Sequence, residues 1–387
     1  MKLLIYSHFF APSTGGVETI VMSLAQGLAA LRRPAGQAQF EVTVVTRTPA
    51  GAFADASLPF PVIRQPSLAR LWGRMRACDV VHVAGPALTP LFLARLAGKP
   101  VVLEHHGFQC ICPNGQLLIE KSGTPCPGHF MAGHHSVCMR CNSGSGWLES
   151  ARLWLFTFVR RLFAARVSAN ITPTKWLGSL LHLPAVRCVA HGLGTQTTYK
   201  RSVKPGHIVF QGRLVTTKGC RLLLDAAELL SDQNRSFELV IIGDGPERAI
   251  LEARAAGAKL REHVRFTGRI GAAQLEGEMA SAAIVVIPSL GGEVFGMVVA
   301  ESMLRGAPVV ASDLGAFLEV VGSAGKTFRT GSAADLARRL SEFLVDPPAS
   351  ENLGQRGRER IVDFYGQDRM IEGHVKVYQE VMTIPRN

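Results

Sequence analysis

The sequence has few of the features that would place it in a membrane or secretory class. Although 47% of its 387 residues are hydrophobic, it has no run of 18 apolar residues, the length at which a membrane-spanning helix is predicted. The longest candidate, at 153–159, is ended by Arg160 and Arg161. The first residues lead directly into a strand-like run and lack the pattern of a cleavable signal peptide. These absences predict a cytoplasmic protein without a membrane span.

Other absences narrow the function classes. The sequence has no G-x-G-x-x-G segment, which argues against a dinucleotide oxidoreductase. The 42 Lys and Arg residues exceed the 30 Asp and Glu residues, which gives a net charge of +12 and favours anionic nucleotides or phospholipid surfaces as partners. Because the basic residues are scattered and no known nucleic-acid module accompanies them, we expect no nucleic acid partner.

Strand-like apolar runs alternate with helical patterns along the whole chain, which predicts an α/β fold with parallel sheets covered on both faces. One set of runs precedes the polar segment 192–206 and a second set follows it. A chain of this length and apolar content can fill two cores. We therefore expect two Rossmann-like domains, at 1–195 and 204–368, with a hinge between them and a cleft where their sheets face each other.

The segment 288–308, PSLGGEVFGMVVAESMLRGAP, is the most informative in the chain. Glu293 and Glu301 lie eight residues apart and straddle a Phe-Gly turn at Gly296 that opens a predicted helix. A solvated helix glutamate beside a loop glutamate is the simpler interpretation of two such residues. The flanking Pro-Ser and Gly-Ala-Pro-Val-Val segments favour a binding site instead.

The start of this helix suits a diphosphate. The first free N–H groups, around Met297 and Val298, would point out of the carboxyl edge of a parallel sheet, where the helix dipole favours an anion. Glu301 lies about one turn into the helix and can accept hydrogen bonds from ribose, while Glu293 can face a sugar. One helix end is thus predicted to hold three parts of a nucleotide sugar.

Further candidates follow other strands at the same kind of edge, where doubly wound sheets bind ligands. Gly16 follows the first strand, Arg213 follows the first strand of the second set, and Gly243 follows the next. Arg213 and Lys218 are suited to stabilise a leaving diphosphate. For each of these the alternative is an ordinary turn glycine or a surface salt bridge.

Together these segments resemble the retaining glycosyltransferases of family 4, which have the two-Rossmann GT-B architecture. The resemblance spans nearly the whole chain and rests on Gly15-Gly16-Val17-Glu18, His106-Gly107, Gly212-Arg213-Leu214, Lys218-Gly219, Gly243-Asp244-Gly245-Pro246 and the Glu293 to Glu301 segment. It implies transfer of a sugar from a nucleotide-sugar donor to a glycan, a lipid-linked or a small-molecule acceptor, as in polysaccharide and cell-envelope synthesis.

The resemblance also implies roles for single residues. Arg213 and Lys218 would neutralise the donor diphosphate, so that no catalytic divalent metal is expected. Glu301 would bind ribose, Glu293 the donor sugar, and His106 would help to position the reacting centre, with His105 or a purely structural histidine as alternatives. The C-terminal helix, at 369–387, would cross back onto the first domain. An epimerase of the same fold, or a non-catalytic, metal-stabilised nucleotide-sugar-binding protein, remains an alternative function.

A cysteine-rich insertion at 108–145 departs from the family pattern. Five of the eight cysteines lie between Cys110 and Cys141, in the order C-x-C-x13-C-x11-C-x2-C. In a cytosolic protein such clusters more often bind metal than form disulfides, and the C-x2-C pair is typical of zinc sites. We predict a structural zinc site; its ligands would be Cys112, Cys126, Cys138 and Cys141. Cys110 can replace Cys112, and an iron–sulfur cluster or disulfides are the alternatives. Cys78, Cys188 and Cys220 lie in apolar contexts and are predicted to be core thiols.

The predicted helix at 147–167 carries aromatic, aliphatic and arginine residues, a composition that suits a membrane interface. Packing of its apolar face against the sheet is the competing explanation. If the acceptor is lipid-linked, we expect this helix to make peripheral contact with the inner face of an anionic membrane.

Overall fold

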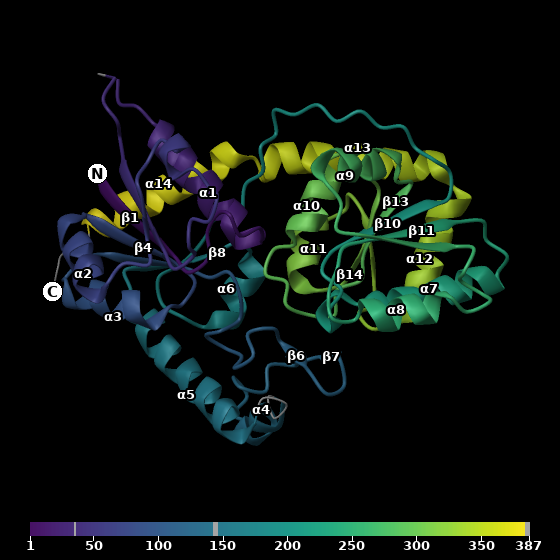
Figure 1. The fold of residues 1–387 in the computed structure, drawn as a ribbon, viewed down its shortest axis with the longest axis horizontal. Coiled ribbons are helices and arrows are strands. Elements are labelled where there is room, and N and C mark those ends of the chain that lie inside the picture. The colour runs from purple at the N-terminus through teal and green to yellow at the C-terminus, as the bar shows by residue number, and fades with distance from the viewer. Residues whose placement is uncertain (35, 142–145, 384–387) are drawn as a thin grey trace. The chain divides into compact units, whose positions relative to one another are not determined.

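The computed structural model describes residues 1–34, 36–141 and 146–383, which group into two compact units (Figure 1). The first unit comprises Met1–Gly115, Gly128–Gly192 and Gly366–Asn387, and the second comprises Gln116–Pro127 and Leu193–Tyr365. The insertion expected at 108–145 is therefore divided between the units. The physical reason is a backbone hydrogen bond of 2.7 Å from Gly292 N–H to the Gln116 carbonyl, which joins residues 116–127 to the second unit.

The first unit is built on a seven-stranded sheet in which neighbouring strands are parallel. Its strand order is β3-β2-β1-β4-β5-β8-β9. The strands are β1 (Lys2–Ser7), β2 (Glu41–Thr46), β3 (Val62–Arg64), β4 (Val80–Ala84), β5 (Val101–Glu104), β8 (Ala169–Thr172) and β9 (Val186–Cys188). All residues of β4, β5 and β8 are buried, as expected for central strands of a sheet covered on both faces.

The helices of this unit are α1 (Gly16–Ala30), α2 (Leu68–Ala77), α3 (Leu88–Leu96), α4 (His135–Cys141), α5 (Trp147–Ala164), α6 (Lys175–Leu181) and α14 (Gln367–Thr383), with a short 3-10 helix η1 (Asp55–Ser57). Helices α1, α2, α3, α6 and α14 pack on the sheet, whereas α4 packs on α5. Helix α14 packs on α1, and α3 packs on α2 and α5. Local capping helps to define the helix starts: Ser67 Oγ accepts a hydrogen bond from Arg70 N–H, and Thr174 Oγ1 accepts one from Leu177 N–H.

The second unit contains a six-stranded sheet, again with parallel neighbours, in the order β12-β11-β10-β13-β14-β15. The strands are β10 (His207–Gln211), β11 (Glu238–Ile242), β12 (Val264–Gly268), β13 (Ile284–Ile287), β14 (Val309–Ser312) and β15 (Lys326–Phe328). In both units the order reverses beside the first strand, between β1 and β4 and between β10 and β13. Such a switch point is where doubly wound sheets bind ligands.

Its helices are α7 (Cys220–Asp232), α8 (Arg248–Ala255), α9 (Ala272–Ser281), α10 (Met297–Leu304), α11 (Gly315–Val321), α12 (Ala333–Val345) and α13 (Pro347–Phe364), with a 3-10 turn η3 (Thr216–Lys218). Figure 1 shows them on both sides of the sheet. Helix α7 buries Leu223, Ala226, Ala227 and Leu230, a spacing of one helical face, and packs on α12. The antiparallel pair β6 (Leu118–Ile119) and β7 (Thr124–Pro125) also belongs to this unit.

Within these described residues, no helix combines the length and the apolar character needed to cross a bilayer. Of the three cysteines expected in the core, Cys78 and Cys220 are buried but Cys188 is exposed. The expectation for Cys188 was wrong because it ends β9, the outermost strand of the first sheet, where one side has no neighbouring strand.

Candidate functional site

The switch point of the second sheet brings the predicted donor residues to one edge. Strand β10 lies between β11 and β13, and the chain leaves the carboxyl ends of these strands towards Arg213, Gly243 and Glu293 respectively. Because parallel strands end at the same edge, three loops that are distant in sequence become neighbours. Arg213 is exposed there.

Lys218 and Glu293 form an ion pair at this edge, although 75 residues separate them. The Lys218 Nζ to Glu293 Oε1 distance is 2.5 Å, and the side chains are 26% and 11% exposed. Ser289 Oγ donates a second hydrogen bond of 3.0 Å to the same carboxylate oxygen. The cation expected at the diphosphate and the carboxylate expected at the sugar are thus in direct contact.

A buried glutamate that the sequence analysis missed holds the turn carrying Lys218. Glu247 is 8% exposed, and its Oε1 accepts hydrogen bonds of 3.0 Å from Thr216 Oγ1 and from Arg221 Nε. Thr216 begins the 3-10 turn that ends at Lys218. Glu247 therefore acts on the position of Lys218 through the turn.

Helix α10 begins at the site with a glycine that no other residue can replace without strain. Gly296 precedes its first residue with φ of 96°, and a Cβ there would lie 2.5 Å from Phe317 Cε1. The first helical hydrogen bond runs from Ala300 N–H to the Gly296 carbonyl. The N–H groups of Met297 and Val298 precede that bond, so they are the groups that a helix start offers to an anion.

Glu301 lies on the same helix in an environment that disfavours its charge. Burial raises the pKa of its carboxyl above the usual value, and Arg305 opposes this only in part. The Arg305 guanidinium is directed elsewhere: it pairs with Glu276 at 3.1 Å and donates to the Glu301 backbone carbonyl. A buried carboxyl with an unfavourable charge is a feature typical of binding sites.

Three backbone contacts fix the loops around these side chains. A Cβ on Gly243 (φ 136°) would lie 1.9 Å from the Gly212 carbonyl oxygen, so only glycine allows the loops after β10 and β11 to touch. The loop between β13 and α10 is held by hydrogen bonds of 2.7 Å from Leu290 N–H to the Thr217 carbonyl and from Gly292 N–H to the Gln116 carbonyl. Gln116 was not identified from the sequence, since it lies 176 positions before Gly292.

The first unit carries the remaining candidates. Gly15 is the N-cap of α1 and Gly16, its first residue, is exposed. The Glu18 carboxylate lies against this helix start, so close that a Cβ on Gly15 would be 2.6 Å from its Oε2. This position matches a first-turn glutamate that stabilises its own helix.

His105 and His106 occupy different environments because side chains alternate along a strand. His105 follows β5, is fully buried, and its Nε2 lies 2.9 Å from Asn170 Oδ1. Burial lowers the pKa of His105 to about 4, which keeps the ring neutral at physiological pH. His106 lies 3.4 Å from the Glu104 carboxylate and its side chain is 5% exposed. His105 is therefore a structural residue, and His106 is the one with some access to solvent.

A pocket of about 510 Å³ opens at the switch point of the first sheet. It is basic and partly apolar: Arg47, Arg152 and Arg160 line it together with His8, Leu71 and Phe156. Because it contains three guanidinium groups, we expect it to favour an anion.

Among the described residues, the cysteines of the insertion form no group of three whose ligand atoms lie within 4.8 Å of one another. Cys112 Sγ donates a hydrogen bond of 2.9 Å to Asn114 Oδ1, and Asn114 Nδ2 lies 3.6 Å from Cys141 Sγ, so that one amide connects two of the predicted ligands. Cys138 lies on α4 with Cys141. Cys126 belongs to the segment grouped with the second unit. Cys110 is buried, which raises its pKa to about 12 and makes it a poor thiolate ligand.

Two doubly wound units, with a helix start and a Lys–Glu pair at the switch point of the second, define a protein of the GT-B class. Comparison with known proteins leads to the same class. Residues 15–194 match the family described as "Glycosyl transferase 4-like domain", and residues 198–360 match "Glycosyl transferases group 1". The chain belongs to the family 4-like glycosyltransferases.

Individual relatives are similar over shorter stretches. The 2-deoxystreptamine glucosyltransferase of Streptomyces kanamyceticus is 35% identical over 41% of this chain, and a phosphatidyl-myo-inositol mannosyltransferase of Mycobacterium leprae is 36% identical over 46%. The matched segments span 41% and 47% of those two proteins, so the chain covers about half of their length.

Solved structures share the fold over nearly the whole chain. The Anabaena protein HepE, solved in complex with UDP-glucose, superposes with a TM-score of 0.74 at 16% identity, covering 99% of this chain and all of that one. The expected GT-B architecture of two parallel-sheet domains is thereby confirmed.

The raised pKa of Glu301 predicts how the stability of the fold changes with pH. Because the folded-state pKa exceeds the unfolded one, the ionised carboxyl destabilises the ligand-free fold. Stability is highest below the unfolded pKa and falls as pH rises through the folded pKa. Glu301→Gln should therefore raise the melting temperature at pH 8 by on the order of 1–3 °C, with little effect near pH 4.

If Glu301 also binds the nucleotide, the same variant should bind it roughly tenfold or more weakly, since charged hydrogen bonds are lost. Melting curves from pH 4 to pH 8, with and without nucleoside diphosphate, measure both effects. Equal stability and equal nucleotide response in the two proteins would contradict the assignment. Glu372→Gln, which removes an exposed carboxylate from helix α14, is the control for the loss of a surface charge.

Proposed function

We propose that the protein is a retaining glycosyltransferase that moves a sugar from a nucleotide-sugar donor to an acceptor. The observation that carries this proposal is the convergence of Lys218, Glu293 and the start of α10 at the switch point of the second sheet, with the half-buried Glu301 on the same helix. The relatives are named as glycosyltransferases, and HepE was solved with UDP-glucose. Both support a nucleotide-sugar donor.

In the proposed reaction the second unit stabilises the leaving diphosphate. The N–H groups of Met297 and Val298, with the cations Arg213 and Lys218, would face the negative charge that develops as the glycosidic bond to the phosphate breaks. Glu301 would accept hydrogen bonds from the ribose. These groups act by position and charge, and the scheme requires no catalytic divalent metal.

The Lys218–Glu293 pair gives the site two states. Without ligand, the two charges neutralise each other at 2.5 Å. A donor diphosphate would compete for the Lys218 ammonium, and the Glu293 carboxylate would then be available to hydroxyls of the transferred sugar. Ser289, which already donates to Glu293 at 3.0 Å, would keep the carboxylate in place. By resemblance, His106 would contact the same sugar, and the acceptor proton would pass to the leaving phosphate.

For the acceptor we propose an anionic, lipid-linked molecule bound by the first unit. The pocket lined by Arg47, Arg152 and Arg160 suits a phosphate group, and one relative is named as a phosphatidyl-myo-inositol mannosyltransferase. A glycan attached to a lipid phosphate would fit the basic lining of the pocket and would agree with the similarity to that mannosyltransferase.

Helix α5 supplies a surface for such a lipid. Leu148, Leu155 and Leu162 are spaced by seven residues, which places them on one helix face, and they are 68%, 53% and 51% exposed. Trp147 is 71% exposed at the start of the helix, and Arg166 is exposed just beyond its end. Exposed leucines with a terminal tryptophan and flanking arginines are typical of a helix that lies at a membrane interface.

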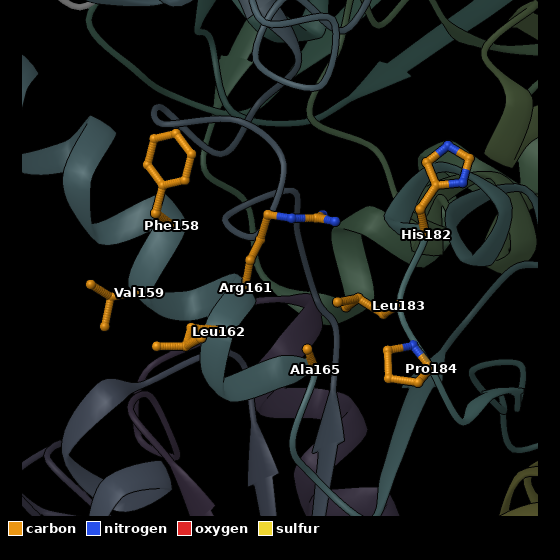
Figure 2. A pocket seen from close by; sticks show the side chains of 8 residues that line it. All are labelled: Phe158, Val159, Arg161, Leu162, Ala165, His182, Leu183 and Pro184. Carbon is orange, nitrogen blue, oxygen red and sulfur yellow. The ribbon is translucent and has the colours of Figure 1, made fainter.

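A second pocket, of about 440 Å³, adjoins the same helix. Figure 2 shows α5 on one side and the segment 182–184 on the other, with the Arg161 side chain reaching between them. Phe158, Leu162 and Leu183 give it an apolar lining that suits a hydrocarbon chain. Arg161 donates to the Leu181 carbonyl at 2.9 Å, so this arginine supports the fold and is not available to lipid headgroups.

We also propose that Cys112, Cys126, Cys138 and Cys141 bind a structural zinc ion. The link from Cys112 through Asn114 to Cys141, and the position of Cys138 one turn before Cys141, support three of the four ligands. Four thiolates would close the coordination shell, so the ion would stabilise the insertion and take no part in transfer.

A donor panel tests the proposed activity. UDP-, GDP- and ADP-sugars are compared by thermal shift, since a ligand that binds only the native state must stabilise it, and release of nucleoside diphosphate is then measured with the stabilising donor. Arg213→Ala and Lys218→Ala should each slow release by about two orders of magnitude. Arg235→Ala, which changes an exposed arginine before strand β11 at the opposite edge of the same sheet, is the matched control. Unchanged release by both variants would contradict the assignment, and interconversion of donor sugars without transfer would indicate an epimerase.

Vesicle co-sedimentation tests the membrane surface. The wild type should pellet with phosphatidylglycerol vesicles, and less of it should pellet as salt screens the arginines. Leu155→Glu with Leu162→Glu should leave the protein in the supernatant. Ile250→Glu with Val345→Glu, which changes two equally exposed positions of the second unit, should pellet as the wild type does. Equal recovery of the α5 variant and the wild type in the pellet would show that α5 is not the contact.

Metal analysis of anaerobically purified protein tests the cysteine site. Cys138→Ser should lose close to one zinc per chain and melt at a lower temperature, because metal binding contributes folding free energy. Cys78→Ser, which changes a buried thiol outside the insertion, should retain the zinc. Iron with visible absorbance near 400 nm would indicate a cluster instead.

A further inference from the structure

Glu104, a fully buried carboxylate in the first unit, is surrounded by four imidazole rings. Its Oε2 lies 3.1 Å from His82 Nε2, 3.4 Å from His106 Nε2 and 3.6 Å from His374 Nε2, and its Oε1 lies 3.6 Å from His191 Nε2. Glu104, His82 and His374 have no exposed side-chain surface. A buried charge of this kind must be paired or must coordinate a metal.

The fold explains how these residues meet. In the β4–β5 register Ala84 is the partner of Glu104, and His82, two residues earlier on the same strand, points to the same face of the sheet as Ala84. Helix α14 covers that face and contributes His374 and Tyr378. Residues from two strands and from the last helix therefore converge within one unit.

The hydrogen bonds of the outer ring nitrogens orient two of the histidines. His374 Nδ1 lies 2.8 Å from the Met370 carbonyl, which can only accept, so Nδ1 carries the proton. In the neutral ring, His374 Nε2 then carries a lone pair and can only accept. It makes no hydrogen bond within the described residues. It nevertheless faces the Glu104 carboxylate. Two acceptors directed at each other need either a proton or a metal ion between them.

The outer nitrogen of His82 is held as well. Its Nδ1 lies 3.0 Å from the Tyr378 hydroxyl, which can donate as well as accept, and its Nε2 lies within hydrogen-bond distance of Glu104 Oε2, at 3.1 Å. Histidines that bind metals usually have their second ring nitrogen held in this way by a carbonyl, carboxylate or other polar group, which fixes the ring and the tautomer. The Met370 carbonyl and the Tyr378 hydroxyl fill that role here.

The spacing of the inner atoms also suits a metal ion. Bonds of about 2.0–2.1 Å in tetrahedral geometry place ligand atoms about 3.3 Å apart. The two observed distances to Glu104 Oε2, 3.1 Å from His82 and 3.6 Å from His374, lie on either side of that value. The three ligand atoms lie within 4.8 Å of one another, so an ion needs only small movements of the side chains.

We propose that His82, Glu104 and His374 form a binding site for a divalent transition metal, with zinc as the ion best matched to two imidazoles and a carboxylate. The ion joins α14 to the central strands of the first unit. The same carboxylate lies against His106, so the metal also holds Glu104 in the position from which it orients that ring. This site is separate from the cysteine site and does not depend on the proposed transfer activity.

Cobalt titration of the whole protein, freed of metal with a chelator, tests the proposal. Cobalt bound to imidazole and carboxylate gives visible bands alone, whereas thiolate ligands add intense near-ultraviolet absorption, so the two sites are distinguishable in one spectrum. Cys138→Ser should remove the thiolate absorption and keep the visible bands of the second site. His374→Gln should lose those bands, and Tyr378→Phe should weaken cobalt binding about 10- to 100-fold.

His207→Gln is the matched control, because His207 is a buried histidine between Glu238 and Glu278 in the second unit and should leave both spectra unchanged. If His374→Gln does not fold, the wild-type titration and Tyr378→Phe still decide the question. A wild type that binds cobalt through thiolates alone, or bands that persist unchanged in both His374→Gln and Tyr378→Phe, would overturn the site and indicate a protonated imidazole beside Glu104.

Discussion

The proposed donor site depends on one constraint, the common direction of three adjacent strands. Because β10, β11 and β13 run parallel, their carboxyl ends deliver three separate loops to one edge of the sheet. The loops then have to approach closely, and the contact of Gly243 with the Gly212 carbonyl shows how little room remains between them. A side chain at Gly243 would separate the loop of Arg213 from that of Asp244.

A second constraint is that each of these carboxylates needs a partner for its negative charge. At the donor site Lys218 and Glu293 neutralise each other, and Glu247 holds the turn that presents the lysine. In the first unit Glu104 is balanced by imidazoles instead. In both places a carboxylate positions a cationic or cation-binding group, and its own burial makes the arrangement costly to disturb.

The sequence was sufficient for the fold because its signals are local. Buried strands such as β4 and β10 are short apolar runs, and the helices between them have one apolar face, so the order of elements could be predicted from residues close together in the chain. The Glu293 to Glu301 segment was found for the same reason. Its turn, its helix start and both carboxylates lie within nine residues.

Contacts between distant residues could not be predicted in this way. Nothing near Gln116 indicates that its carbonyl would accept a hydrogen bond from Gly292, and His82, Glu104 and His374 are spread over nearly 300 positions. The division of the insertion between the units has the same cause, since a backbone hydrogen bond carries no signature in residue type. Glu247 directly follows the recognised Gly-Asp-Gly-Pro turn, and only its burial distinguishes it from a surface glutamate.

The discontinuity of the first unit has a consequence for synthesis on the ribosome. The second unit contains nothing beyond Tyr365, so its chain is complete before α14 has been made. The first unit, although its strands emerge earlier, must wait for that last helix to cover the face that carries Glu104. At about 5–20 residues per second, its half-built sheet stays without α14 for roughly 10–40 s after Gly192 is added. During nascent-chain growth the unit that begins later is therefore the one that can fold first, and the exposed face of the earlier one is the natural target for a chaperone.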